Sequence, residues 1–566
     1  MKRKLAAPWL DFYGKRKSHL KYPNTSMYNL LANKAAGFMN AVAYDFFGLE
    51  MTFGKFLEDI DKAARSLAAF GVKKGDVVTV ISANIPQAIT AIYAANKIGA
   101  IANVVHPLSS EHDVKYALEL TGSTFLFVID VAWPVTVGAL TDSKVDNVVI
   151  LSVRDSLNGL MRLGYDVTSG RKVDKIPPAP NRYTYEEFLA HGRGKKDVKV
   201  KTTSEDYAAI LYSGGTTGKP KGILLTNGNF NAHAIQAKDF ASEELSVGNS
   251  ILGILPIFHG FGLSIGFHTM FCAGVTSVML PKFEAKKFHK ILAKYRPNII
   301  LGVPTLFEAF LQDQKIKKLD LSFMKLIICG GDALSDNLKK SCDKVLKSRG
   351  CQAEIMQGYG LTEFLAVASF GPQERIKLGS IGIPLADVYM KIVEPGSDVK
   401  KPTGETGEIV ITGPNMMVGY LCEEEETNRA LIKHSDGHVW LHTGDLGHID
   451  DEGYLFFEQR LKRMIVSSGY NVYPNHIEEV ISEIDEVLMV TVVGLPDEYR
   501  GQIAKAFVVL NHGVRPSEDL KAKIMDHARK NLPKYSLPRT IEFRKSLPRT
   551  KIGKVDYRNL AEGGGE

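Results

Sequence analysis

The sequence has few cysteines and no dense block of basic residues. Only five of its 566 residues are cysteines, none of them in a C-x-x-C pair, which argues against a disulfide framework and a zinc site. The formal charge of +7 is mild for this length, and no basic stripe with interleaved aromatics occurs, so we expect no nucleic-acid partner. Reduced thiols and the lack of a signal-peptide hydrophobic region predict a cytoplasmic location.

One long stretch lacks charged residues altogether. Residues 245–281 contain no Lys, Arg, Asp or Glu, and such a stretch is long enough to span a bilayer. Pro256, several glycines and two histidines interrupt it, however. We therefore predict a buried strand, loop, helix and strand inside a large core, with a membrane span as the less favoured alternative.

What the sequence does contain is a regular alternation of helix-like and strand-like segments. The alternation runs through residues 51–150 and resumes over 206–460, which predicts an α/β fold of layered, mainly parallel sheets. Among its elements we predict a helix at 51–71 and strands at 77–82, 100–105, 298–303, 326–331 and 353–360, with further helices at 475–486 and 517–532. The turn-forming segment GETGEIVITGP at 404–414 opens a more β-rich part, and the chain restarts as a compact α+β unit after Arg460. We predict a large N-terminal domain over residues 1–461 and a small, mobile C-terminal domain over 462–566.

An excursion rich in Arg, Lys, Pro and Gly separates the two alternating regions at 154–205. Leu157, Leu160, Met161 and Leu163 give this excursion a weak amphipathic face. Such a face suits a packed surface helix, which we favour, or a peripheral contact with a membrane surface. The sequence gives no prediction for the oligomeric state.

The densest chemical motif reads SGGTTGKPKG at 213–222 and follows the apolar segment AAILY. Glycines let backbone N–H groups converge on a polyanion, while hydroxyls and lysines add donors and positive charge. The motif is not a Walker A loop, because Ser213 stands where the first glycine belongs and Pro220 follows the first lysine. We predict a polyphosphate loop formed by Ser213, Gly214, Gly215, Thr216, Thr217, Gly218, Lys219 and Lys221.

Two further motifs place a carboxylate near hydroxyl groups. In QGYGLTE at 357–363, Glu363 follows Thr362, a pair that suits Mg²⁺, and Tyr359 offers a flat face for a purine. In HTGDLGHID at 442–450, Asp445 can accept hydrogen bonds from the hydroxyls of a ribose. The structural alternatives are a helix N-terminus capped by Thr362 and an Asx-turn at Asp445.

The last motif is PRTKIGKVDYR at 548–558. A lysine delivered by a mobile domain can stabilise the negative charge that builds at phosphorus when a carboxylate attacks the α-phosphate of ATP. The motif offers lysines for such a role, and the structural alternative is a surface lysine in a basic tail.

Taken in order from residue 51 to Lys554, the motifs resemble those of the adenylate-forming superfamily of acyl-CoA synthetases, nonribosomal-peptide adenylation domains and firefly luciferase. The resemblance implies that the 213–222 loop wraps the β- and γ-phosphates of ATP. It also implies that Tyr359 stacks on adenine, Thr362 contacts phosphate and Glu363 binds Mg²⁺. The remaining ATP contacts that it implies are Gly331, Asp332 and Ala333 of GGDAL, then Gln357, Gly358, Gly360, Asp445 and Arg460, the last two at the ribose.

The same resemblance implies how the small domain acts. Lys462 would be the hinge, and Lys554 the catalytic lysine that also touches ATP, with Thr362 and Glu363 sharing in the chemistry. His259 of PIFHGFG would gate the acyl pocket or orient the carboxylate, and a purely structural histidine is an equal alternative. The segment SSGYN at 467–471 would line the pantetheine tunnel of coenzyme A through Ser468, Gly469 and Tyr470.

The implied enzyme is an AMP-forming acid–thiol ligase that needs Mg²⁺ and takes ATP, coenzyme A and a small carboxylic acid. PWLDFY at 8–13, NVVHPLSSEHDVKYAL at 103–118 and the 154–205 excursion resemble bacterial medium- and long-chain fatty-acid CoA ligases. Three alternatives stay open. They are an aryl or bile-type acid CoA ligase, a fatty acyl-AMP ligase that loads a carrier protein, and a membrane fatty-acid transport protein.

Overall fold

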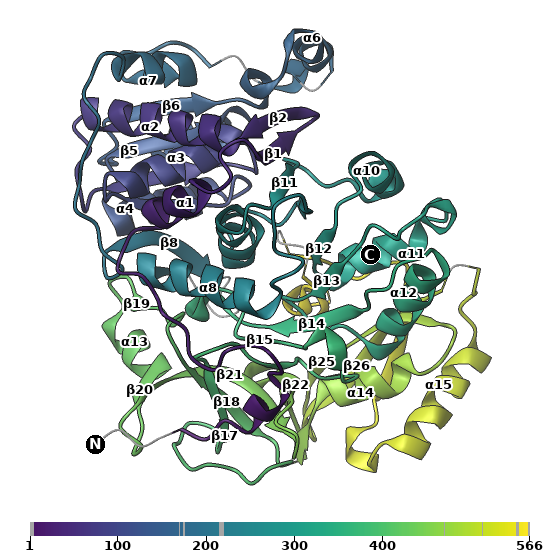
Figure 1. Cartoon of the computed structure of the whole chain (residues 1–566). Coiled ribbons are helices and arrows are strands. Elements are labelled where there is room, and N and C mark those ends of the chain that lie inside the picture. Colours follow the sequence, from purple (N-terminus) through teal and green to yellow (C-terminus); the bar gives the residue numbers. More distant parts are fainter. Residues whose placement is uncertain are drawn as a thin grey trace.

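The computed structural model describes residues 5–168, 170–173, 176–213, 220–468, 470–511, 513–550 and 554–563. Large sheets layered with helices occupy the upper part of the molecule, and β-rich units lie below them (Figure 1). The predicted α/β class is confirmed. The cysteines are free, as expected, and Cys422 is the exposed one beside four that are buried.

The first large sheet carries the alternating segments of the N-terminal region. Its strand order is β19-β9-β8-β4-β3-β5-β6-β7, and β3 pairs in parallel with both β4 and β5. The strands predicted near 77–82 and 100–105 are confirmed, and both are short, largely buried runs rich in β-branched residues. The strands are β3 (Val77–Ile81), β4 (Ile101–Val105), β5 (Phe125–Ile129), β6 (Asn147–Leu151), β7 (Arg182–Thr184), β8 (Tyr207–Ser213), β9 (Lys221–Thr226) and β19 (Gly419–Tyr420).

The second large sheet has the order β16-β15-β14-β13-β12-β10-β11-β1-β2. Its inner strand β13 pairs in parallel with β12 and β14, and the buried strands predicted within 298–303, 326–331 and 353–360 are confirmed. The strands are β1 (Val42–Phe46), β2 (Leu49–Thr52), β10 (Ser250–Gly253), β11 (Thr276–Met279), β12 (Ile299–Gly302), β13 (Leu326–Cys329), β14 (Ile355–Tyr359), β15 (Ser369–Phe370) and β16 (Ile383–Pro384).

The uncharged stretch at 245–281 folds as predicted into a strand, a loop, a helix and a strand. After β10 a loop leads into the π-helix η5 (Phe261–Thr269) and the short α9 (Met270–Cys272), and then β11 follows. Every residue of η5 is buried, and η5 packs against α8 (Asn227–Phe240) between the two large sheets (Figure 1). Within the described ranges no helix is both long and apolar enough to cross a bilayer.

Amphipathic helices cover the sheets. The helix predicted from the pattern at 51–71 is α2 (Phe53–Ala69), whose first turn is capped by the Thr52 hydroxyl, which accepts a hydrogen bond from the Lys55 N–H. Its apolar side chains recur at helical spacing and are buried. The others used below are α1 (Met27–Ala35), α3 (Pro86–Lys97), α11 (Pro304–Gln312) and α12 (Asp336–Ser348).

A β-rich unit follows the second sheet, as the turn-forming segment at 404–414 predicts. Its strands pair in the antiparallel order β17-β18-β21-β20, with β22 beside β21. The N-terminal helix η1 (Pro8–Phe12) lies on this unit, where the buried Trp9 ring meets the Tyr389 ring edge to face at 6.5 Å. The elements are β17 (Tyr389–Val393), β18 (Gly407–Thr412), α13 (Glu424–Ala430), β20 (Leu431–Lys433), β21 (Val439–Ile449) and β22 (Leu455–Arg460).

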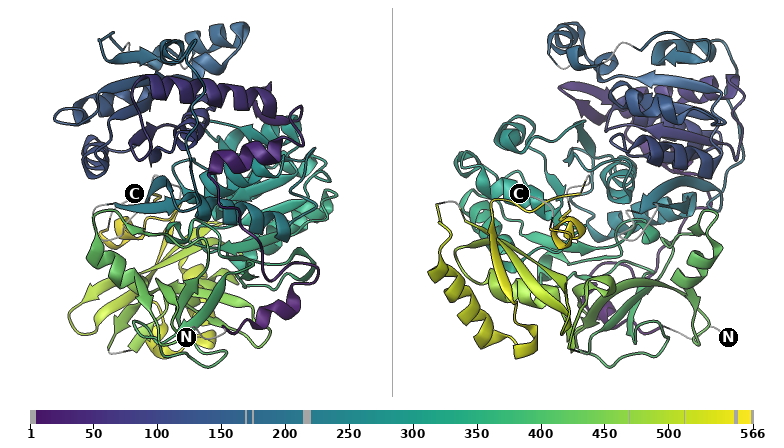
Figure 2. Two further views of the ribbon diagram at one scale, coloured as in Figure 1. Left: turned by 60° about the vertical axis from the view of Figure 1, so that its left-hand side comes forward. Right: turned by 180° about the vertical axis from the view of Figure 1, so that it is seen from behind.

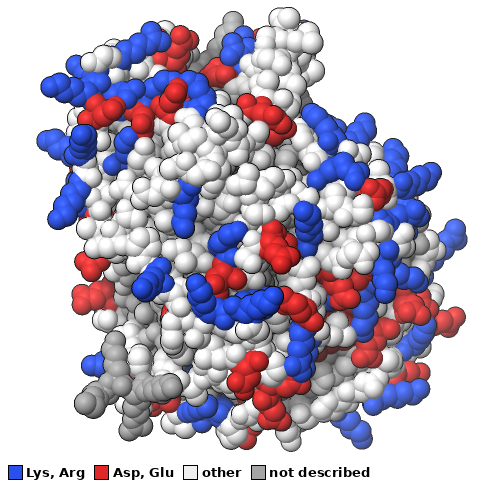
Figure 3. Space-filling view, in the orientation of Figure 1, with Lys and Arg blue, Asp and Glu red and all other residues white. Residues whose placement is uncertain are grey.

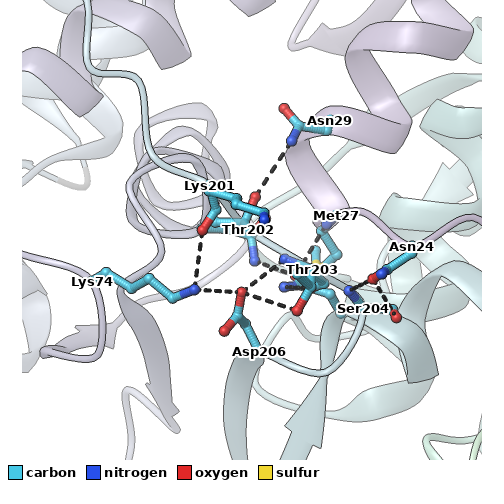
Figure 4. A network of polar contacts seen from close by, with 11 residues as sticks. Asn24, Met27, Asn29, Lys74, Lys201, Thr202, Thr203, Ser204 and Asp206 are labelled. Atoms are coloured by element: carbon cyan, nitrogen blue, oxygen red, sulfur yellow. Dashed lines mark hydrogen bonds and ion pairs between the residues drawn. The ribbon is translucent and has the colours of Figure 1, made fainter.

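The 154–205 excursion is only partly separate from the main fold. Its second half rejoins the first sheet, because β7 pairs in parallel with β6 and α7 (Tyr185–His191) packs against α2 with Phe188 fully buried. Figure 4 shows how the returning chain is tied down: Asp206 accepts hydrogen bonds from Lys74 Nζ at 2.7 Å and from the Thr203 N–H at 2.8 Å. The first half carries α6 (Gly159–Val167) between the turns η3 (Val153–Ser156) and η4 (Gly170–Lys172).

The chain beyond Ile465 forms a sheet of its own, in the order β24-β23-β26-β25 with β27 beside β26. A separate apolar core lies beneath it, with Ile465, Ile477 and Ile524 among its buried members. The predicted helices at 475–486 and 517–532 are α14 (Pro474–Ser482) and α15 (Glu518–Asn531). The strands are β23 (Ile465–Ser467), β24 (Tyr470–Val472), β25 (Val487–Asp497), β26 (Gly501–Leu510) and β27 (Thr540–Arg544).

Candidate active site

The predicted phosphate loop connects two antiparallel strands. β8 ends at Ser213, which pairs with Lys221 at the start of β9, so this loop is a hairpin connection and not the strand-to-helix turn of a Walker A motif. The Lys221 ammonium forms an ion pair with Glu426 of α13 and lies 4.8 Å from the centre of the Tyr420 ring. The other predicted ligands of this loop lie outside the described residues. They are Gly214, Gly215, Thr216, Thr217, Gly218 and Lys219.

The predicted adenine and ribose residues meet in the interior. Tyr359, at the end of β14, donates a hydrogen bond from its hydroxyl to Asp445 Oδ2 on β21 at 2.8 Å. Asp445 is also the cross-strand partner of Arg460, whose Nε lies 3.3 Å from Oδ1. The Asp445 carboxylate therefore bonds across the site and does not close an Asx-turn. This link between Tyr359 and Asp445 is not visible in the sequence, where the two residues belong to separate motifs.

The charge of Asp445 depends on these two neighbours. Burial raises the pKa of the Asp445 carboxyl, while the Arg460 guanidinium and the hydrogen bond from Tyr359 lower it. Burial next to Asp445 raises the pKa of the Tyr359 hydroxyl, so Tyr359 stays a proton donor at neutral pH. A buried carboxylate held in this way can accept hydrogen bonds from sugar hydroxyls without first losing its own water shell.

A tight turn follows Tyr359. A Cβ atom at Gly360 would meet the Ala366 carbonyl oxygen at 1.4 Å, so only glycine fits there. Leu365 and Ala366 have φ angles of 49° and 94°, in the left-handed region. Thr362 begins the single turn η8 (Thr362–Phe364), whose N-cap is Leu361 with no side-chain bond, so Thr362 does not serve as a helix cap.

Glu363 connects this turn to the phosphate hairpin. Its Oε1 accepts a hydrogen bond from the Tyr420 hydroxyl at 3.1 Å, and the Tyr420 ring lies beneath Lys221. A half-buried carboxylate beside a threonine fits Mg²⁺, which prefers hard oxygens and keeps waters and phosphate oxygens as its other ligands. The described residues contain no group of three or more His, Cys, Asp or Glu side chains that could hold a metal, so any Mg²⁺ here depends on such outside ligands.

Glu408 supports the ribose motif from the neighbouring strand, and the sequence analysis missed it. Its Oε1 accepts a hydrogen bond from the Gly444 N–H at 3.0 Å, and its Oε2 accepts one from His442 Nδ1 at 2.9 Å. Gly444 has φ +69°, which glycine tolerates best. The sequence did contain a signal for Glu408. It is a glutamate inside the otherwise apolar run GEIVIT, and a carboxylate on a buried strand needs a hydrogen-bond partner.

Lys554 lies in the same site as these residues of the large unit. A Cβ atom at Gly331 would stand 3.9 Å from Lys554 Cε. Burial is the largest cause of the lowered pKa of Lys554, followed by the Arg460 guanidinium, while Asp332, Asp445 and Glu363 favour the charged form. Lys554 is therefore buried next to Gly331 of the GGDAL segment, and the predicted ribose and metal carboxylates act on its charge.

Contacts across the boundary hold the Lys554 loop against the large unit. Arg549 Nη2 donates to Glu308 Oε2 on α11 at 2.8 Å, and Glu308 is only 7% exposed. Burial raises the pKa of Glu308 while Arg549 lowers it. On α12, Asn337 Nδ2 donates to the Ser482 carbonyl oxygen at 2.5 Å. The sequence carried one signal of the Arg549–Glu308 contact, because Glu308 is a glutamate within the apolar segment LGVPTLFEAF.

His259 has both a structural contact and a place near Lys554. Its Nδ1 accepts a hydrogen bond from the Phe261 N–H at 3.2 Å, at the start of η5. Burial lowers the pKa of His259 to about 4, with a further lowering by Lys554, so the ring is neutral at pH 7. The gating and structural interpretations of His259 therefore both stay open.

The predicted hinge and coenzyme A loop lie outside this cluster. Lys462 sits in the one-turn helix η10 (Leu461–Arg463), between β22 and β23. Ser468, with φ +53°, donates its N–H to the Arg500 carbonyl oxygen at 2.8 Å, and Tyr470 stacks on Tyr535 at 4.7 Å. These contacts are inside the small unit, and Gly469 lies outside the described residues.

This chain is similar to known proteins over most of its length. The family described as AMP-binding enzyme matches residues 31–421, and the AMP-binding enzyme C-terminal domain matches residues 476–554. A long-chain-fatty-acid–CoA ligase of Bacillus subtilis (strain 168) is 34% identical over 98% of both chains. A long-chain-fatty-acid–CoA ligase of Haemophilus influenzae is 31% identical over 92% of this chain and 91% of that protein.

Among solved structures, the anthranilate CoA ligase AuaEII in complex with anthranoyl-AMP has the same fold. It superposes with a TM-score of 0.82 at 23% identity and covers 96% of this chain and 98% of its own. Because the family match spans most of the chain and the relatives match nearly end to end, this protein belongs to the AMP-binding enzyme family.

Proposed function

We propose that this protein joins a fatty acid to coenzyme A in two steps driven by ATP, releasing AMP and pyrophosphate. The observation that carries the proposal is that Lys554 lies against Gly331 of the large unit, with its loop held there by the bond from Arg549 to Glu308. A mobile ammonium inside a nucleotide site suits chemistry at the α-phosphate. The long-chain-fatty-acid–CoA ligases that match over almost the whole chain support the substrate class.

In the first step a carboxylate oxygen of the acid attacks the α-phosphorus, and the bond from that phosphorus to the bridging oxygen of pyrophosphate breaks. Lys554 stabilises the negative charge that develops on the α-phosphate oxygens. Asp445 and Arg460 hold the ribose, Tyr359 and the 331–333 segment hold the adenine, and the 213–222 loop holds the departing pyrophosphate. Glu363 with Thr362 would hold Mg²⁺, which supplies neutralising charge to the phosphates.

In the second step the thiol of coenzyme A attacks the acyl carbon of the acyl-adenylate. The thiol loses its proton, the carbon–sulfur bond forms, and AMP leaves with the electrons of the mixed-anhydride bond. We propose that the small domain, residues 462–566, first turns about Lys462, withdraws Lys554 and brings in the loop with Ser468, Gly469 and Tyr470. The arrangement described above, with Lys554 in the site, corresponds to the first step.

The acid itself is the part of the proposal that rests most on the relatives. The apolar, fully buried η5 and the segment at 301–310 suit an acyl wall, and His259 lies just before η5, bonded to the Phe261 N–H. The sequence offers no charged partner for a second carboxylate or an amino group. The competing assignments are an aryl or bile-type acid, a carrier-protein acceptor and a transport role. A cytoplasmic location stays a prediction from the free cysteines.

A pyrophosphate-release screen separates these assignments. The purified protein is given Mg·ATP with fatty, aromatic or amino acids, each with and without coenzyme A. We expect the fastest release with a medium- or long-chain fatty acid, and turnover beyond one equivalent only when coenzyme A is present. Faster release with an aromatic acid would replace the fatty acid in this proposal, and indifference to coenzyme A would point to a carrier-protein acceptor.

A further inference from the structure

Arg463, the residue that follows the predicted hinge Lys462, has an unusually enclosed side chain. Figure 3 shows Lys and Arg side chains where these residues usually lie, on the surface. Arg463 is different, because only 16% of its side chain is exposed. A guanidinium away from water is costly unless its N–H donors are paired. Its partners therefore carry information, and the proposed mechanism has so far given this residue no role.

The guanidinium of Arg463 joins two elements of the small unit. Its Nη2 donates to Glu478 Oε1 on α14 at 2.7 Å, and its Nη1 donates to Asn475 Oδ1 on the same helix at 2.9 Å. Glu478 Oε1 also accepts a hydrogen bond from the Val492 N–H of β25 at 2.7 Å. Glu478 is itself only 16% exposed. The two side chains therefore form a largely enclosed ion pair that fixes the hinge segment to α14 and β25.

A further contact of Arg463 reaches the segment that carries Lys554. The Cζ atom of Arg463 lies 3.7 Å from the centre of the Tyr557 ring, as in a cation–π contact. Tyr557 is the first residue of α16 (Tyr557–Ala561), three residues after Lys554. Its ring also packs against the apolar cluster that contains Phe507 and Leu547. The ring therefore has a fixed place in the small unit, with Arg463 against its face.

Backbone hydrogen bonds connect Tyr557 to Lys554. The Asp556 N–H donates to the Pro548 carbonyl oxygen, and the Thr550 N–H donates to the Lys554 carbonyl oxygen, each at 2.8 Å. These bonds tie the chain before Lys554 to the chain after it, directly next to the Tyr557 ring. Lys554 therefore cannot shift far without Tyr557.

The contact between Arg463 and Tyr557 lies where the small unit meets the large unit. In the view from behind, α16 stands between the sheet of the small unit, which it contacts through β25, and the large unit (Figure 2). Burial and the charge of Asp332 raise the pKa of the Tyr557 hydroxyl, while Arg463 lowers it. The ring is therefore neutral at pH 7, and its electron-rich face suits a guanidinium.

From these contacts we infer that Arg463 is a positioning residue that couples rotation at the hinge to the placement of Lys554. It is tied to α14 through Glu478 and to the Lys554 segment through Tyr557, so the hinge end, the helix and the lysine turn as one body. Without the guanidinium, the Lys554 segment would reach the site in several orientations instead of one. A misplacement of about 1 Å can cost about 100-fold in rate.

This role of Arg463 rests on the proposed function, because it is exerted through Lys554. A positioning residue and a purely structural residue differ in one measurable way. If Arg463 acts through Lys554, its removal should slow adenylate formation in the wild type and change nothing further once Lys554 is absent. A residue that only stabilises the fold would lower the rate equally in both backgrounds.

The test is single-turnover formation of the acyl-adenylate, followed as pyrophosphate release from Mg·ATP and the acid that the screen identifies. For Arg463→Ala we expect a step that is about 10- to 100-fold slower, with half-saturation by ATP within about twofold of the wild type. Arg463→Ala combined with Lys554→Ala should be no slower than Lys554→Ala alone.

Arg544→Ala is the matched control for Arg463→Ala. It removes another arginine of the small unit that lies over an aromatic ring, that of Phe507, and pairs with a glutamate, Glu542. Its rate of adenylate formation should stay within about twofold of the wild type, because Arg544 has no contact with the hinge or with the Lys554 segment among those described for it.

A second pair of variants approaches the contact from its other side, because Arg463→Ala leaves Glu478 without its partner and is expected to destabilise the small unit. Tyr557→Leu keeps an apolar side chain against Phe507 but removes the ring, and adenylate formation should slow by about 3- to 10-fold. Tyr557→Phe keeps the ring and should recover most of that loss.

The outcomes separate the coupling from the proposed function. A wild-type rate for Tyr557→Leu would overturn the inference, and so would an Arg463→Ala effect that is just as large in the Lys554→Ala background. In both cases a slow Lys554→Ala enzyme would leave the proposed function standing. A wild-type rate for Lys554→Ala alone would overturn both the role of Lys554 in the proposed function and the coupling.

Discussion

The large unit and the small unit contribute to the active site in different ways. The proposed nucleotide residues of the large unit are fixed within that unit, by the cross-strand pairing of Asp445 with Arg460, the Tyr359–Asp445 bond and the support of Gly444 by Glu408. Lys554 arrives from the small unit instead, on a loop that is held across the boundary by Arg549 and Glu308.

This difference separates binding from chemistry. Strand register and buried hydrogen bonds keep the ATP residues in one geometry, which costs no reorganisation when the substrate arrives. A lysine held by a few contacts across a boundary can be withdrawn once its step is complete. The comparison therefore predicts that changes in the large unit weaken ATP binding, whereas changes at the boundary act on one half-reaction.

The largest effect is expected for Lys554→Ala. Formation of the acyl-adenylate should fall by at least about 100-fold, because the charge that develops at the α-phosphate loses its stabilising ammonium. Transfer of a supplied acyl-adenylate to coenzyme A should stay near the wild-type rate. Both half-reactions are measured separately by single-turnover assays, and equal loss of both would contradict the division of labour between the units.

Asp445→Ala is expected to act on ATP binding. Loss of a buried carboxylate that accepts hydrogen bonds should raise the KM for ATP by about 10- to 100-fold, and the KM for the acid should change little. Initial rates at varied ATP give the comparison. An unchanged KM for ATP would remove Asp445 from the nucleotide site, whatever the effect on kcat.

Glu308→Gln tests the contact that holds the Lys554 loop. Removing the charge weakens the ion pair with Arg549, so adenylate formation should slow by about 5- to 50-fold, while transfer to coenzyme A stays constant or rises. Glu562→Gln, which removes an exposed partner of Arg558 in α16 (Tyr557–Ala561), is the matched control. A similar slowing in both variants would mean that the contact does not select one orientation.

Lys462→Pro tests the predicted hinge. A proline restricts the backbone at that position, so one domain orientation should be favoured and the ratio of the two half-reaction rates should change. The measurement compares pyrophosphate release with acyl-CoA formation from supplied adenylate. If neither half-reaction rate changed, Lys462 would not be the hinge.

The smallest effect concerns pH. Because burial and Arg460 lower the pKa of Lys554 below its ordinary value of 10.5, the charged form is lost at a lower pH than for an exposed lysine. Adenylate formation should therefore decline as pH rises through that lowered pKa, while it is unaffected below it. Lys554→Arg keeps its charge and should remove this alkaline decline. A decline of the same shape in Lys554→Arg would assign it to another group.

Local sequence was sufficient for the main helices and strands. A β-branched run predicted β3, and apolar runs that end in glycine-rich turns predicted β12, β13 and β14, because buried parallel strands need continuous apolar side chains. Short contiguous motifs, through their resemblance to a known family, supplied the proposed residues for phosphate, adenine, ribose and catalysis. The uncharged stretch was correctly interpreted as core because proline and glycine interrupt it.

Only the tertiary structure decided which side chains meet. Tyr359 and Asp445, Glu408 and Gly444, and Arg549 and Glu308 are distant in sequence, and their pairing depends on strand register and on how the small unit docks. The orientation of α6 was also decided by contacts. Its sequence pattern predicts an amphipathic helix but not which face is buried, and with Asp166 paired to Arg154 the apolar Leu160 and Leu163 are exposed. Composition sets which faces a segment has, and long-range contacts set where each face points.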